Sequence, residues 1–193
     1  MYLGKQVRLE RIINRETGRT IIVPMDHGVS DGTPRGLRDM AKAVHDMDEG
    51  MADAVLMHKG LIRASGCADA NVDLGLIMHI TASTALSPSG NIKVLTGTVE
   101  EAIRLGFSSV MYDCSMLPFE ENVRRTREMT AKAHAAGCSL EAEIGHVGSN
   151  GSAEEAVAKT IYTQPQDALR FAAESGCDAL AVAIGTAHGV YAE

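Results

Sequence analysis

The sequence predicts an α/β fold in which parallel strands alternate with helices, and three observations support this. A unit recurs four times: an amphipathic helical segment, a glycine, two or three residues and a short apolar run. Polar groups capable of chemistry follow nearly every apolar run. No GxGxxG motif follows the first predicted strand, which disfavours a dinucleotide-binding open sheet. A TIM (β/α)₈-type barrel is therefore favoured, because it gathers groups from many strand ends at one mouth, whereas an open sheet uses one switch point.

Helix ends and helix starts carry recognisable signals. In each recurring unit a glycine stands where a helix would end with a left-handed residue before the next strand. These glycines are Gly50, Gly106, Gly137 and Gly176. Two capping boxes and two prolines in first turns mark helix starts. The capping boxes begin at Thr98 and Ser152, and the prolines are Pro118 and Pro165.

These signals place the elements in order along the chain. Strands are expected near 20–25, 53–57, 75–80, 108–113, 139–144 and 179–184. Helices are expected near 36–49, 98–105, 118–136 and 165–175. The stretches 85–97 and 145–164 are expected to be loops, the first with a short extra strand at 92–95. A full barrel usually has about 250 residues. With 193 residues and six expected strands, the sequence predicts a barrel that is truncated after strand six.

Composition narrows the class of protein. A length of 193 residues, with 45% hydrophobic and 22% charged residues, fits a single domain over 1–193. The net charge of -7, without a basic stripe, makes nucleic acid an unexpected partner. No apolar run is long enough to cross a bilayer and the N-terminal region is charged, so a cytoplasmic protein without a membrane partner is expected.

Candidate metal ligands follow three successive strands. Glu141 and Glu143 alternate with apolar residues and therefore share one face, which in a barrel points inward. A carboxylate there needs a partner, a proton or a cation. With Asp113 after the fourth strand and His188 after the sixth, Glu143 forms a set suited to Zn²⁺ or another divalent cation. A structural carboxylate network is the competing interpretation, and His79 is expected to be a satisfied interior histidine.

Other strand ends supply candidates for proton transfer and substrate binding. Asp26, with His27 beside it, follows the first strand and can act as a general base, or it can simply organise the loop. Lys59 can bind phosphate or form a Schiff base, although a solvated lysine is commoner at such positions. Gly185 and Gly189 would let a ligand approach the backbone closely.

Two family resemblances cover different halves of the chain. Residues 3–105 resemble the archaeal-type class I aldolases, the group of fructose-bisphosphate aldolase and aminodideoxyheptulosonate synthase. The matching segments are GKQVRLERIINRETGRTIIVPMDHGVSDG, AVLMHKG, GLIMHITASTALSP and TVEEAIRLG. Residues 106–193 resemble the class II, metal-dependent ketose-bisphosphate aldolases. There the segments are GFSSVMYDCSMLPFEENVRRTREMTAKAHAAG, SLEAEIGHVG, YTQPQDA and DALAVAIGTAHGVY. Both families use (β/α)₈ barrels, so one barrel with a class I-like half, 1–105, and a class II-like part, 106–193, is implied.

Each resemblance implies an incomplete site. The class I resemblance implies proton transfer at Asp26, but the Schiff-base lysine of that group belongs on the sixth strand, where 179–184 contains no lysine. The class II resemblance implies zinc binding by His188 and a second metal position at Asp113 and Glu143. Of its HxDH sequence on the third strand only His79 is retained, and its last zinc histidine belongs on a seventh strand.

Three hypotheses for function follow. The first is a metal-dependent aldolase acting on a phosphorylated sugar such as fructose 1,6-bisphosphate, in which a divalent cation polarises the carbonyl. The second is Schiff-base aldol chemistry with Lys59 as the nearby amine. The third is a non-catalytic partial barrel, whose open edges would favour a homo-oligomer. A chelator separates the first two hypotheses, because it abolishes only metal-dependent turnover.

Overall fold

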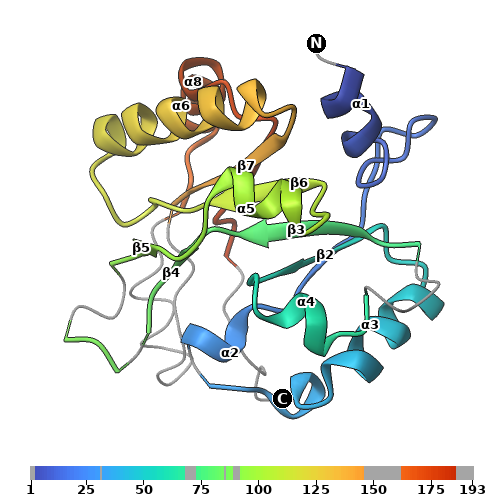
Figure 1. Ribbon diagram of the computed structural model, residues 1–193. Coiled ribbons are helices and arrows are strands. Elements are labelled where there is room, and N and C mark those ends of the chain that lie inside the picture. The colour runs from blue at the N-terminus through green and yellow to red at the C-terminus, as the bar shows by residue number, and fades with distance from the viewer. Residues whose placement is uncertain are drawn as a thin grey trace.

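Six parallel strands form one sheet in the computed structural model, which describes residues 3–30, 32–67, 73–84, 86–88, 92–145 and 162–185. In sheet order the strands are β1 (Ile22–Pro24), β2 (Ala54–Met57), β3 (Gly75–His79), β6 (Ser109–Tyr112), β7 (Ser139–Ile144) and β8 (Ala179–Val182). The strands of this sheet lie side by side in the order in which the chain visits them, and the sheet curves as an open half-barrel (Figure 1). The predicted α/β class and partial barrel are confirmed.

Helices connect the strands and cover the outer face of the sheet. The four predicted helices are present as α3 (Met40–Glu49), α5 (Val99–Arg104), α6 (Phe119–Ala135) and α8 (Pro165–Ser175). Shorter helices were not predicted: α1 (Leu3–Leu9), α2 (His27–Ser30), η1 (Arg35–Leu37) and α4 (Leu61–Ala64). In Figure 1, α6 and α8 lie side by side on one flank, and α3 and α4 lie together on another. In the described part of the chain, no helix combines the length and apolar character that a membrane span needs.

The predicted helix ends are mostly confirmed. Three of the four glycines have a left-handed backbone, with φ angles of 88°, 73° and 67° at Gly106, Gly137 and Gly176. The prediction for Gly50 is wrong: its φ is -75°, because its N–H still bonds to the Asp46 carbonyl and the left-handed residue is Met51, with φ 58°.

Helix starts follow the sequence signals as well. The capping box at Thr98 is present, with its hydroxyl accepting from the Glu101 N–H and the Glu101 carboxylate accepting from the Thr98 N–H. Pro165 opens α8, and Pro118 is the residue that precedes α6. The second predicted capping box, at Ser152, lies outside the described residues.

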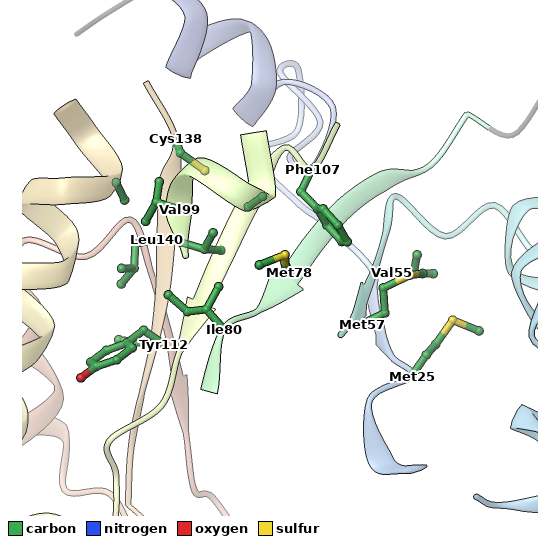
Figure 2. Packing of buried hydrophobic residues seen from close by; sticks show 14 of the residues in the cluster. Met25, Val55, Met57, Met78, Ile80, Val99, Phe107, Tyr112, Cys138 and Leu140 are labelled. Carbon is green, nitrogen blue, oxygen red and sulfur yellow. The ribbon is translucent and has the colours of Figure 1, made fainter. Parts of the chain in front are cut away.

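The core has two layers, one on each face of the sheet. Outward-facing strand residues such as Val55, Met78, Val110 and Leu140 pack beneath the helices, and Figure 2 shows part of this cluster, from Met25 to Leu140. Inward-facing residues form a smaller apolar cluster with the segment that follows α1. They are Ile12, Ala54, Leu56, Ile77 and Met111. This cluster fills the barrel interior below the polar groups at the carboxyl ends of the strands, the end at which sites in this fold lie.

A two-stranded antiparallel sheet extends beyond the carboxyl end of β3. It consists of β4 (Thr81–Ala82) and β5 (Val94–Leu95). Thr81 pairs with Leu95 and Ala82 pairs with Val94. The short strand predicted at 92–95 is therefore present. The hairpin reverses the chain at the mouth and so carries residue 93 back towards the sheet.

Candidate active site and metal centre

Polar side chains from four strands lie in one inward-facing row at the carboxyl ends. The registers of β1 with β2 and of β2 with β3 place Asp26, His58 and His79 next to one another. His79 pairs with Met111, which in turn pairs with Glu141 on β7. Because residues paired in a parallel sheet point to the same face, the strand register alone assembles this row.

Hydrogen bonds orient the two histidines. His79 Nδ1 lies 2.6 Å from Asp26 Oδ2, and its Nε2 lies 3.0 Å from the Thr81 hydroxyl. That hydroxyl accepts from the Asp113 N–H at 3.1 Å, so its own proton is available to His79 Nε2. His58 Nδ1 lies 3.2 Å from the His79 carbonyl oxygen, to which it can only donate. His58 therefore keeps Nε2 unprotonated when the ring is neutral, the form that binds a metal.

Electrostatics favour the same protonation states. Burial alone would raise the pKa of Asp26. The hydrogen bond from His79 and the charges of His79 and His58 outweigh burial and lower the pKa to about 2. Burial and the neighbouring His79 lower the pKa of His58. At neutral pH an ionised Asp26 thus faces a neutral His58, and both are in the state that a cation requires.

These three residues form a candidate metal centre. Asp26, His58 and His79 each offer one ligand atom, and the three atoms lie within 4.8 Å of one another. Two imidazoles and a carboxylate suit zinc or a similar divalent ion. Sequence reasoning did not propose His58, and it expected His79 to be an interior residue. The sequence signal that could have identified them is the alternation of side chains along a strand. His79 ends β3 and His58 directly follows β2, and both lie at inward-facing positions.

A second polar group lies one inward position further along the strands. Asp113 Oδ1 accepts from the Ser115 N–H at 2.7 Å, and Oδ2 forms an ion pair with Lys93. Burial raises the pKa of Asp113, but Lys93 and the hydrogen bonds of Ser115 together hold it below its ordinary value. Burial and the negative charge of Asp113 raise the pKa of Glu143. The structure therefore brings the predicted Asp113 and Glu143 together, and it adds Lys93, which sequence reasoning missed because the hairpin positions it.

Glu141 carries a buried carboxyl group whose hydrogen bonding is incomplete among the described residues. Its Oε2 atom is buried, and within the described part of the chain it has no hydrogen-bond partner. Burial, followed by the negative charge of Asp26, raises the pKa of Glu141 to about 7. Near neutral pH this carboxyl group can therefore both release and accept a proton.

The remaining predicted site residues lie around this group. His27 Nδ1 is 4.0 Å from Asp26 Oδ1. Lys59 Nζ donates to both carboxylate oxygens of Glu101, at 3.0 and 3.2 Å, so its role in substrate binding stays a prediction. Gly185 has φ 110°, and an added Cβ would lie 3.3 Å from the Tyr162 ring. The predicted metal ligand His188 and the predicted Gly189 lie outside the described residues.

Comparison with known proteins establishes the family. A family model described as fructose-bisphosphate aldolase class-II matches residues 91–193, more than half of the chain. The chain belongs to this family. Enzymes of the family use zinc, and the group Asp26, His58 and His79 is a possible place for it in this chain.

Curated relatives of this aldolase-family chain include a fructose-bisphosphate aldolase and a heptulosonate synthase. A fructose-bisphosphate aldolase of Giardia intestinalis is 57% identical over 95 residues, which cover 49% of this chain and 28% of that protein. A 2-amino-3,7-dideoxy-D-threo-hept-6-ulosonate synthase of Archaeoglobus fulgidus is 40% identical over 108 residues, 56% of this chain and 40% of that protein. The chain thus spans less than half the length of these relatives. The suspected membership of the aldolase superfamily is confirmed, whereas the boundary at residue 105 stays a prediction.

A solved structure agrees with the fold. A Schiff-base-forming fructose-1,6-bisphosphate aldolase superposes with a TM-score of 0.63 at 24% identity, covering 91% of this chain and 69% of that one. At this identity the likeness supports the barrel architecture and not the chemistry.

Proposed function

We propose that the mouth formed by the strand ends carries divalent-metal-assisted aldol chemistry on a phosphorylated ketose, with fructose 1,6-bisphosphate as the first substrate to test. The observation that carries the proposal is the convergence of Asp26, His58 and His79 at the carboxyl ends of β1, β2 and β3. Family membership supports the reaction class. The barrel supports the location, because sites in this fold lie at that end of the strands.

The donor set fits a divalent cation. His58 has Nε2 left to bind, because Nδ1 faces a backbone carbonyl oxygen. Asp26 is held ionised and supplies the negative charge. His79 is held between Asp26 and Thr81, so it could bind the cation through Nε2 only when the Thr81 hydroxyl turns its proton away from that nitrogen. A bound divalent cation would supply Lewis-acid polarisation of a substrate carbonyl oxygen.

Proton transfer is assigned to Glu141. A carboxylate with a pKa of about 2, as at Asp26, is a weak base at neutral pH, so we place Asp26 among the cation ligands. Glu141 has a pKa of about 7 and a buried oxygen without a partner in the described residues. It can take the hydroxyl proton of a ketose when the carbon–carbon bond breaks and return it in the reverse direction.

The decisive experiment measures cleavage of fructose 1,6-bisphosphate together with metal content. Turnover that is lost in chelator and restored by Zn²⁺, without trapping by borohydride, supports the proposal. Turnover that survives the chelator, with substrate trapped on a lysine by borohydride, supports Schiff-base chemistry instead. Absence of both turnover and bound metal supports a non-catalytic partial barrel.

A pair of variants tests the ligands directly. His58→Asn should remove the stoichiometric zinc while the circular dichroism spectrum stays native. His45→Asn is the matched control, because His45 lies exposed on α3 and pairs with Glu49 of the same helix. Equal zinc content in the two variants would contradict the assignment of His58.

A further inference from the structure

Lys93 is an unexpected cation inside the mouth. It directly precedes β5, whose residues Val94 and Leu95 are exposed, yet its own side chain is only 22% exposed. The hairpin explains the difference, because pairing of β5 with β4 turns the Lys93 side chain back towards the sheet. Its ammonium group forms an ion pair with Asp113, whose side chain is 3% exposed.

The ammonium group is surrounded by acids. Asp113 provides the direct contact, and the charges of Glu143 and Asp26 act on Lys93 as well. Each oxygen of Asp113 already has a partner, because Oδ1 accepts from the Ser115 N–H and Oδ2 contacts Lys93. The carboxyl groups of Glu143 and Asp113 lie close enough to share a hydrogen bond. The Lys93 ammonium group therefore already supplies a positive charge beside these carboxyl groups.

Oxygen ligands in this arrangement would otherwise suit a hard divalent cation. A cation there would have to displace Lys93, and the displaced ammonium would stay tethered to the hairpin nearby. Like charges in a partly buried site repel strongly, because the dielectric screening is weak. The histidine group differs in its direct contacts. The charge of Lys93 acts on Asp26 and His58, but within the described residues its ammonium group forms its ion pair with Asp113 and not with Asp26.

We propose that Lys93 is a built-in cation that excludes divalent metal from Asp113 and Glu143, so that the mouth offers one metal position, at Asp26, His58 and His79. The inference shares the mouth with the proposed function but does not depend on turnover. It assigns the acidic pair to Lys93 in place of the second metal position that the sequence resemblance implies.

The test counts bound Mn²⁺, an ion that prefers oxygen ligands. The free ion is measured by electron paramagnetic resonance during titration of the whole chain. Lys93→Met should bind one Mn²⁺ more per chain than the wild type, with at least about tenfold tighter affinity for that extra ion. The double variant Lys93→Met with Asp113→Asn should lose the extra ion. Lys42→Met is the control, since it removes an exposed lysine that pairs with Asp46 on α3.

The inference would be overturned if Lys93→Met bound the same number of Mn²⁺ ions as the wild type. It would also be overturned if Asp113→Asn alone bound fewer Mn²⁺ ions than the wild type. If Lys93→Met does not fold without metal, Mn²⁺ should restore its native circular dichroism spectrum, and failure to do so also counts against the inference. His58→Asn separates the two proposals. It lowers the count at the histidine group, and it leaves the difference between Lys93→Met and the wild type unchanged.

Discussion

The two ends of the barrel both bury charged side chains, but among the described residues the mouth leaves one buried carboxylate oxygen without a partner. At the amino end, Asp178 receives Lys5 of α1 on Oδ1, while Oδ2 lies 2.8 Å from His134 Nε2 and accepts from the Leu140 N–H at 3.0 Å. At the mouth, by contrast, Glu141 keeps a buried oxygen without a partner in the described residues. A closed network fixes α1 against the barrel, whereas an incomplete network keeps the capacity to bind a ligand or a proton.

The charge balance differs in the same way. Asp178 is matched by Lys5 and His134, and the hydrogen bonds keep the pKa of its carboxyl low despite burial, which alone would raise it. The mouth buries four carboxyl groups and one lysine among the described residues. The acids are Asp26, Asp113, Glu141 and Glu143, and the lysine is Lys93. Excess negative charge at a buried site is costly unless protons or cations offset it, which indicates that the mouth is shaped by function.

The largest expected effect comes from breaking the closed network. Asp178→Asn should reduce the free energy of unfolding by about 3 kcal/mol, because it leaves Lys5 buried without its counter-charge. Urea denaturation at pH 7 measures this loss. A loss below about 1 kcal/mol would show that the amino end behaves as an exposed ion pair.

The pH dependence of this effect has a definite sign. The pKa of Asp178 is lower in the folded state than its ordinary value of 3.8. The ionised carboxylate therefore stabilises the fold at pH values above 3.8, and this stabilisation is lost as the pH falls through the lowered pKa. The acid limb of the stability curve should therefore be flatter in Asp178→Asn than in the wild type.

A change of opposite sign is expected at the mouth. The folded-state pKa of Glu141, about 7, exceeds its ordinary value of 4.5, so the folded state favours the protonated form. Stability should fall as the pH rises towards 7, by about 1.4 kcal/mol per pH unit at most. Glu141→Gln should therefore stabilise the metal-free chain by roughly 2 kcal/mol at pH 8 and have little effect at pH 4.

Thermal unfolding in chelator at the two pH values tests this prediction. Glu128→Gln is the control, because Glu128 lies exposed on α6 and pairs with Arg124. If Glu141→Gln destabilises the chain at pH 8, the mouth is a satisfied network like the amino end, and the contrast between the two ends disappears.

A smaller loss is expected when the link between the two polar groups of the mouth is removed. Thr81→Val keeps the shape of the buried side chain but deletes the hydroxyl that joins His79 to the Asp113 N–H. The expected cost is about 1 to 2 kcal/mol, because a buried N–H is left unpaired. Thr81→Ser should recover most of it in urea denaturation, and equal stability of the two variants would show that the hydroxyl does not matter.

The smallest effect sets the baseline for the other three. Asp46→Asn breaks an exposed ion pair with Lys42 on α3 and should change the free energy of unfolding by less than about 0.5 kcal/mol. A larger change, measured under the same conditions, would mean that exposed charges stabilise this chain as much as buried ones do.

Local sequence signals predicted the elements that depend on near neighbours. The capping box at Thr98 and the left-handed glycines Gly106, Gly137 and Gly176 follow from hydrogen bonding and sterics within a few residues. The wrong prediction at Gly50 is also a local matter. The helix keeps one more hydrogen bond there, so the left-handed residue is Met51 and not Gly50.

The candidate site was predicted in part. Alternation along β7 indicated that Glu141 and Glu143 face inward, and Asp113 was expected at the neighbouring strand end. The clustering of His58 with His79 and Asp26 was not foreseen, because it depends on the register between three separate strands. Register is decided by packing of the whole sheet, which no single strand encodes.

The sequence by itself determined the fold class, the alternation of strand side chains and the acidic character of the mouth, because these properties arise from backbone sterics and residue type over short distances. Only the tertiary structure decided which cation meets Asp113 and which histidines meet Asp26. Those contacts join residues 20 to 53 positions apart, through a hairpin and through strand pairing. Their geometry exists only once the complete sheet has formed, since the entropy of closing each loop is offset by packing elsewhere in the chain.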